Sequence, residues 1–148
     1  MKLISLTLLL FAFANPSTTH WENDFSKAKQ TATEQHKCIL LNFSGSDWCG
    51  PCIRLHKEIF DNGIFTDFAN DKLVLVNADF PRQKKNQLPK NQQQQNEQLA
   101  DKYNAAGSFP LTLLLDADGK VVKVWGGFYK DGAAKFVDEL KEALHGSN

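Results

Sequence analysis

The stretch Trp48-Cys49-Gly50-Pro51-Cys52 places two cysteines one helical turn apart, behind an apolar run and where a helix is expected to begin. The short backbone between the sulfurs suits a dithiol that opens and closes as a disulfide. At a helix N-terminus, unpaired N–H groups and the helix dipole stabilise a thiolate, the form that attacks disulfides. The spacing therefore predicts redox chemistry at Cys49 and Cys52.

The same spacing also occurs in structural zinc sites and by accident. A structural zinc ion normally takes four protein ligands. The sequence contains no second Cys-x-x-Cys and no Cys/His pair at ligand spacing that would complete such a set. We therefore expect neither a metal nor another cofactor at this site.

The composition predicts one globular domain. The chain has 148 residues, of which 42% are hydrophobic, and this is enough for one real core but not for two domains. Lys and Arg number 17, as do Asp and Glu, and the aromatic residues do not interleave with a basic stripe. These features argue against nucleic-acid binding. We expect a monomer whose partners meet an apolar or mixed surface.

The N-terminus has the three parts of a secretory signal. Lys2 is followed by an apolar run from Leu3 to Phe13, which closes on Ala12-Phe13-Ala14. A transmembrane anchor is the competing interpretation, but the run is shorter than the ~20 apolar residues that a span needs. We therefore predict a signal peptide over residues 1–14, with cleavage after Ala14, and a single domain over residues 15–148 outside the cytoplasm.

The third cysteine, Cys38, opens an apolar run and is left over once Cys49 and Cys52 are paired. Three cysteines do not make a disulfide-stapled scaffold, even in an exported chain. We interpret Cys38 as a small core residue.

Apolar periodicity predicts an alternation of helices and strands. The first half is expected to hold a helix over 21–36, a strand over 38–43, a helix from the cysteines to about residue 60, a further helical turn and a strand over 73–76. The second half is expected to hold a short helix with apolar residues at 99, 103 and 106, a hairpin of 111–115 and 121–125, and a helix over 131–145. This order is typical of an α/β sandwich whose first two strands are parallel. On the second helix Cys52 faces inward with Leu55 and Ile59, whereas Cys49 lies at the exposed tip.

Residues 81–95 differ in composition from the rest of the chain. Arg82, Lys84, Lys85 and Lys90 stand among Gln and Asn residues, and Leu88 is the only large apolar residue. This pattern predicts a solvated loop. A basic docking site is the alternative interpretation.

These features together resemble the thioredoxin superfamily over Trp21 to His145. The most specific element is Trp-Cys-Gly-Pro-Cys after the first core strand. The second is Phe109-Pro110 directly before the hairpin, where members of that family keep a cis-proline facing the disulfide. The polar insert before Phe109 is similar to exported, periplasmic thioredoxin-like proteins of bacteria. The resemblance implies a thioredoxin fold, in which helices flank a central mixed sheet and the polar insert precedes the helix before the cis-proline.

The resemblance also implies roles for the motif residues. Cys49 resembles the attacking cysteine and Cys52 the buried resolving cysteine. Trp48 would flank the pair, while Gly50 and Pro51 would set the tight start of the helix.

The segment before the hairpin has an implied role as well. Pro110 would present a backbone edge to which a substrate strand hydrogen-bonds, and Phe109 would line the same groove.

The function implied by the resemblance is thiol–disulfide exchange. Gly-Pro between the cysteines resembles the reducing members, so we expect a protein-disulfide reductase that acts on periplasmic or secreted proteins. A membrane thiol-electron donor would recharge it. Peroxide reduction on the same fold would need a cysteine in a Pro/Thr-rich loop, which the sequence lacks. A non-catalytic or chaperone-like binding module remains the alternative.

The sequence departs from the family at the proton acceptor of the resolving thiol. Thioredoxins have a buried Asp in the first core strand and a Lys in the next, and the matching residues here are Asn42 and Leu75, with a bulge before the motif. A neutral Asn cannot act as a base. His56, one helical turn after Cys52, is a candidate acceptor. The alternative is a partly exposed helix residue without a role.

Two carboxylates flank the motif. Asp47 or Glu58 would disfavour the Cys49 thiolate if either lay close to it. The alternative is that both are simply solvated.

Overall fold

The structure is a computed structural model that describes residues 19–146. The predicted signal peptide lies outside the described residues. Within residues 19–146, none of the helices combines the length and the apolar composition needed to cross a bilayer.

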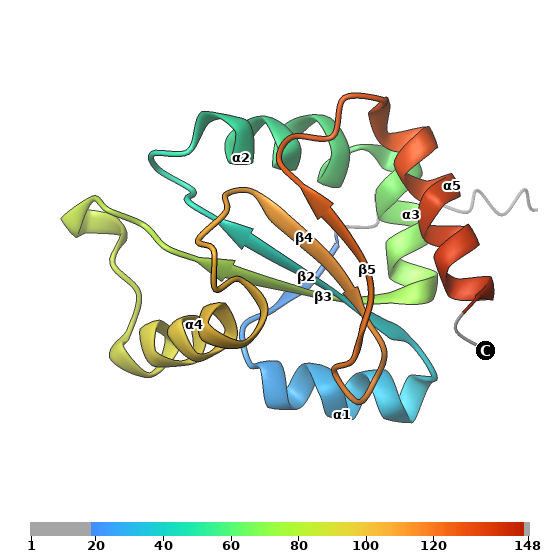
Figure 1. Cartoon of the computed structure of the whole chain (residues 1–148), viewed down its shortest axis with the longest axis horizontal. Coiled ribbons are helices and arrows are strands. Elements are labelled where there is room, and N and C mark those ends of the chain that lie inside the picture. The colour runs from blue at the N-terminus through green and yellow to red at the C-terminus, as the bar shows by residue number, and fades with distance from the viewer. Residues whose placement is uncertain (1–18, 147–148) are drawn as a thin grey trace, which may run out of the picture.

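A mixed five-stranded sheet forms the centre of the fold (Figure 1). In spatial order its strands are β1 (Trp21–Glu22), β3 (Leu73–Asp79), β2 (Cys38–Ser44), β4 (Leu111–Leu115) and β5 (Val121–Gly126). Strands β1, β3 and β2 run parallel, whereas β4 is antiparallel to β2 and β5 is antiparallel to β4. The predicted α/β architecture, with parallel first strands and a C-terminal hairpin, is confirmed.

Helices cover both faces of the sheet. They are α1 (Phe25–Gln35), α2 (Gly50–Leu55) with the π-helical turn η1 (His56–Phe60), α3 (Gly63–Lys72), the 3-10 turn η2 (Lys84–Asn86), α4 (Lys90–Tyr103) and α5 (Gly132–His145). Figure 1 shows α1 and α4 on one face and α2, α3 and α5 on the other. The strands β3, β2 and β4 divide their side chains between these two layers, as the two-residue period of a strand requires.

The two layers have separate cores. Leu40, Leu75 and Leu114 point into the layer of α2, α3 and α5, where Phe60 and Phe136 pack with ring centroids 6.2 Å apart. The alternate strand residues, Ile39, Leu41, Phe43, Val74, Val76, Leu113 and Leu115, pack against α1 and α4. The central strands are therefore buried on both faces, which explains their continuous apolar runs.

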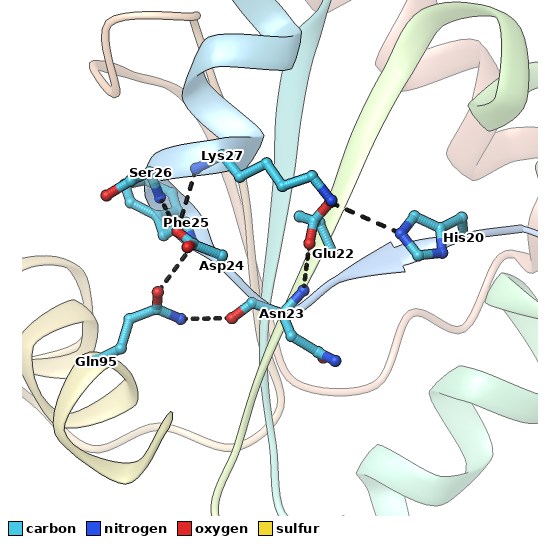
Figure 2. Close-up of polar contacts among 8 residues, drawn as sticks. All are labelled: His20, Glu22, Asn23, Asp24, Phe25, Ser26, Lys27 and Gln95. Atoms are coloured by element: carbon cyan, nitrogen blue, oxygen red, sulfur yellow. Dashed lines mark hydrogen bonds and ion pairs between the residues drawn. The ribbon is translucent and has the colours of Figure 1, made fainter. Parts of the chain in front are cut away.

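The prediction that the first helix begins at Trp21 is wrong. Trp21 lies in β1, where it pairs with Leu75 of β3, and the helix begins only at Phe25. Asp24 is the N-cap, because its carboxylate accepts hydrogen bonds from the backbone N–H groups of Ser26 and Lys27 at 2.8 and 3.1 Å. The cap fixes the point at which strand turns into helix (Figure 2).

Helix α4 braces the same corner. The Gln95 side chain accepts a hydrogen bond from the Phe25 N–H at 2.9 Å and donates one to the Asn23 carbonyl at 2.8 Å (Figure 2). One amide thus satisfies backbone groups on both sides of the Asp24 cap. The two hydrogen bonds of Gln95 tie α4 to the start of α1.

The prediction of a loop over residues 81–95 is also wrong in its second half. Helix α4 begins at Lys90, directly after Pro89, which stands at the N-cap position. The inward face of the helix carries Leu99 and the amide of Asn96, both buried. Because an amide occupies a core position, the segment shows little apolar periodicity in the sequence.

The last helix largely matches its prediction. It begins at Gly132 and buries Ala133, Phe136, Val137 and Leu140, whereas the neighbouring Ala134 is exposed.

Candidate redox site

Cys49 and Cys52 form a disulfide at the start of α2, with their Cα atoms 5.2 Å apart. Cys49 is the N-cap of α2, and its Sγ accepts a hydrogen bond from the Cys52 backbone N–H at 3.3 Å. Pro51 stands in the first turn, where its missing N–H costs no hydrogen bond. The sulfur of Cys49 therefore occupies the place where a helix N-terminus stabilises negative charge.

The two sulfurs differ in exposure, but less than the sequence predicts. Cys52 is fully buried, and Cys49 keeps only 5% of its surface exposed. The expectation that Cys49 lies at an exposed tip is wrong for this disulfide-bonded state, in which its sulfur is turned inward to Cys52. Only Cys49 has any surface at which a partner can reach it.

Trp48 lies beside the disulfide and is held on several sides. Its indole N–H donates to the Phe80 carbonyl at 2.7 Å, its ring meets Phe109 edge-on at 5.4 Å, and the Arg82 guanidinium lies 3.7 Å above it. A side chain at Gly45 would overlap the indole, so the residue must be Gly. The structure thus brings the side chains of Trp48 and Phe109 into contact.

The Phe109–Pro110 peptide bond is cis, which confirms the prediction for this segment. Pro110 is buried, and its carbonyl accepts a hydrogen bond from the Gly127 N–H at 2.8 Å. The Asn104 side chain fixes the preceding loop by bonding both the N–H and the carbonyl of Ser108. Gly50 and Pro51 are exposed on the first turn of α2.

A buried polar cluster lies in the sheet at Asn42, which has no exposed surface. Its amide nitrogen donates to Asn77 Oδ1 at 3.0 Å and faces His56 Nε2 at 3.3 Å, and its Oδ1 accepts from the Thr112 hydroxyl at 3.1 Å. Every polar atom of the Asn42 side chain thus has a partner. We call Asn42, His56, Asn77 and Thr112 the amide cluster.

The register of the sheet identifies the neighbour of Asn42 on β3. Strand β2 pairs with β3 in unbroken register, so that Asn42 lies opposite Asn77, while Leu75 lies opposite Leu40. No bulge interrupts this pairing. An amide therefore stands across from Asn42.

His56 is half-buried against Trp21 and Phe60, whose rings lie 5.3 and 5.0 Å from its own. Burial lowers the pKa of His56, against smaller opposing effects of Asp61, Asp79 and Asn77. Because the Asn42 amide nitrogen is a donor, Nε2 must be the acceptor and Nδ1 carries the proton. Burial and this contact both favour the neutral imidazole of His56.

A cleft of about 470 Å³ connects the amide cluster with the surface. His56 and Asn77 line it together with Ser46, Ile53 and Lys57. The His56 side chain therefore lies between the buried Asn42 and solvent.

The two flanking carboxylates have other partners. Asp47 accepts hydrogen bonds from the backbone N–H groups of Arg82 and Gln83, both at 2.9 Å, and these bonds lower its pKa. Glu58 pairs with Arg54 at 2.8 Å on the outer face of the helix, and this pairing lowers its pKa. Asp47 thus anchors the segment that follows β3.

Sequence reasoning missed Asn77 and Thr112. A polar residue inside an otherwise apolar strand is the signal for both, since Asn77 interrupts Leu73–Ala78 and Thr112 interrupts Leu111–Leu115.

Cys38 is free and half-buried, and burial, aided by Asp116, raises its pKa. Among residues 19–146, no three His, Cys, Asp or Glu side chains are grouped so as to hold a metal ion.

Comparisons with known proteins agree with this geometry. The protein-family model of the thioredoxin-like domain matches residues 25–144 of this chain. The disulfide bond reductase DsbH of Chlamydia pneumoniae is 38% identical over 124 residues, which are 84% of this chain and 72% of that protein. The thioredoxin-related protein DsbJ of the same organism is 28% identical over 120 residues, which are 81% of this chain and only 34% of DsbJ.

A solved structure of a DsbH oxidoreductase superimposes with a TM-score of 0.80 at 32% identity, over 95% of both chains. With its disulfide-forming cysteines at a helix N-terminus, the chain is a thiol–disulfide oxidoreductase and belongs to the thioredoxin-like domain family.

Proposed function

We propose that the chain reduces disulfide bonds of proteins outside the cytoplasm through a dithiol/disulfide cycle of Cys49 and Cys52. The observation that carries this proposal is the Cys49–Cys52 disulfide at the start of α2, in which only Cys49 reaches the surface. Gly50-Pro51 between the cysteines supports the reducing direction. The name of a relative, the disulfide bond reductase DsbH, also supports the reducing direction.

The cycle has two exchange steps. The Cys49 thiolate attacks one sulfur of a substrate disulfide, so that a mixed disulfide forms and the other substrate sulfur leaves as a thiolate. The Cys52 sulfur then attacks Cys49 Sγ, which breaks the mixed disulfide and releases the second substrate sulfur. Two electrons pass to the substrate, and the protein ends with the Cys49–Cys52 disulfide seen in the structure.

The proposed substrate groove runs beside the disulfide, between Trp48 and the loop of Phe109 and Pro110. A substrate strand would hydrogen-bond to the backbone edge of this loop. Because Gly127 already bonds the Pro110 carbonyl, we assign the strand's contacts to Phe109.

We further propose that His56 takes up the proton of the Cys52 thiol. His56 follows Cys52 by one helical turn, is neutral, and borders a cleft that leads to solvent. Uptake at Nε2 requires the Asn42 amide to turn over, so that its oxygen faces the imidazole.

Replacement of His56 by Gln tests this role. We expect the resolving step to slow by about tenfold at pH 7, since water in the cleft is a poorer base than a positioned imidazole. Single-turnover release of a thiol substrate from the mixed disulfide measures that step. An unchanged rate would show that His56 only fills space.

The cellular setting completes the proposal. Residues 1–14 would be removed as a signal peptide, and residues 15–148 would act as a monomeric domain in the periplasm or outside the cell. A membrane thiol-electron donor would return the disulfide to the dithiol, because an oxidising compartment supplies no reductant. N-terminal sequencing of the exported protein tests cleavage after Ala14.

The redox equilibrium with glutathione tests the direction of the reaction. We expect a reduction potential near about −270 mV, the value of thioredoxin. The fraction of Cys49–Cys52 disulfide in buffers of graded glutathione ratio gives this potential. A value near about −120 mV, typical of a strong periplasmic oxidant, would reverse the assignment.

A further inference from the structure

A cleft of about 460 Å³ opens beside the redox site, on the side of residues 81–97. Trp48, Phe80 and Phe109 line it from the redox side. Leu88 and the side chains of the glutamines at 87 and 93 line it from the other side. We call this space the insert cleft.

The outer wall of the insert cleft is fixed by hydrogen bonds. Asp47, next to the motif, bonds the backbone N–H groups of Arg82 and Gln83 at 2.9 Å. Gln93 on α4 donates its side-chain N–H to the Leu88 carbonyl at 2.6 Å. The segment is therefore anchored at both ends, to the redox site and to a helix.

Two more amides complete the wall. The Gln87 side chain donates to the Pro81 carbonyl at 2.9 Å, and the buried Asn96 donates to the Asp79 carbonyl at 2.8 Å. A pre-formed space with apolar walls and a few fixed polar groups is the usual form of a binding site.

The polar groups of the cleft include both acceptors and donors. Gln87 and Gln93 each donate to a backbone carbonyl and keep their Oε1 atoms as acceptors, while the Arg82 guanidinium lines the cleft as a donor. Glu97 adds a carboxylate to the lining. This arrangement suits an extended peptide, whose backbone offers both N–H donors and carbonyl acceptors. The rings of Phe80 and Phe109 suit a large apolar side chain.

The insert cleft is continuous with the proposed substrate groove. Trp48 precedes Cys49 and Phe109 precedes Pro110, and both side chains line the cleft. A polypeptide whose cysteine is joined to Cys49 therefore passes the cleft within a few residues of that cysteine.

We infer that the insert cleft binds a large apolar side chain of an extended substrate segment, close in sequence to the substrate's reactive cysteine. The inference rests on the proposed reductase function and adds a rule for substrate choice. Residues 81–97 then form a recognition wall, in which Leu88 supplies the apolar contact.

Matched peptide disulfides test the inference. Each peptide has one disulfide in a Ser/Gly background, with a single Phe placed in turn at the three positions on either side of one cysteine. We expect kcat/KM for the best Phe peptide to exceed that of the Phe-free peptide by about tenfold, the scale on which an apolar pocket discriminates. Leu88→Ser should abolish this preference, so that the Phe peptides and the Phe-free peptide are reduced with equal kcat/KM.

Val124→Ser is the matched control, because Val124 is half-exposed on β5, outside the cleft. It should keep the preference, and both variants should keep the redox equilibrium with glutathione, which shows that the fold and the disulfide are intact. Equal kcat/KM for all peptides in the unmodified protein would overturn the inference and leave the reductase function standing. The inference would also be overturned if the preference survived Leu88→Ser, or if that substitution lowered kcat/KM equally for every peptide. Failure to reduce any peptide would overturn both proposals.

Discussion

Replacement of Cys49 by serine is expected to lower the rate of insulin-disulfide reduction by about 10³-fold or more, because a hydroxyl at the N-cap of α2 does not ionise near neutral pH and cannot form the mixed disulfide. Reduction of insulin by dithiothreitol, with and without the protein, measures the rate. Cys38→Ser is the matched control. Cys38 lies at the start of β2, at the other end of the strand from the motif, and is free in the structure. This variant should keep full activity.

The companion variant, Cys52→Ser, separates an enzyme from a binding module. Without the resolving sulfur, the mixed disulfide on Cys49 should persist, and substrates should be recovered from cells covalently attached to it. If nothing accumulates on Cys49, the assignment of the attacking cysteine is wrong. Partner binding that survives Cys49→Ser, in a protein that never turns over, would instead support a chaperone-like module.

The sequence predicts those parts of the fold that local signals determine. Two apolar runs around an Asp/Gly turn indicate the hairpin, and the motif itself indicates the start of α2. By contrast, β1 has only two residues, Trp21 and Glu22, and exists because β3 pairs with it. No local pattern identifies such a strand, and the spacing of Trp21 from Phe25 imitates a helix.

The candidate site shows the same division. Cys49, Cys52, Trp48 and the cis bond at Pro110 follow from the motif and from its resemblance to a family. The amide cluster does not, because it depends on the register of β2 against β3, which places Asn77 beside Asn42. Register is a non-local property, and a shift of one residue would turn Asn77 to the other face.

The amide cluster consists of neutral groups that satisfy one another's hydrogen bonds. Asn42 supplies N–H donors to His56 and Asn77 and an acceptor to Thr112. A carboxylate in its place offers no donor unless it is protonated. His56 and Asn77 present acceptors to this position, so the surroundings favour an amide.

Replacement of Asn42 is accordingly expected to have the largest effect on stability. Asn42→Leu keeps the volume but leaves the His56, Asn77 and Thr112 side chains without their partner, which should cost about 3 kcal/mol of unfolding free energy. Urea unfolding of the oxidised protein measures it. Leu113→Met on the adjacent strand, a substitution of similar volume at a buried apolar position, is the control and should cost less than about 1.5 kcal/mol.

Asn42→Asp makes the sharper test, because it should reverse the pH dependence that His56 contributes. In the unmodified protein the pKa of His56 in the folded state lies below its unfolded value of about 6.5. The stability that this difference contributes is present above about pH 6.5 and is lost as the pH falls from there through the folded pKa. A carboxylate at position 42 would instead raise the pKa of His56. The contribution would then be present below pH 6.5 and lost as the pH rises.

The destabilisation caused by Asn42→Asp should therefore shrink between pH 8 and pH 5. In a His56→Gln background only the titration of the new carboxyl group remains, so the change with pH should be smaller. A destabilisation that is constant over this range, or that grows as the pH falls, would show that Asn42 and His56 are not coupled. Because His56 is the proposed proton acceptor, the same result would also show that the Asn42 amide takes no part in the transfer of the Cys52 proton.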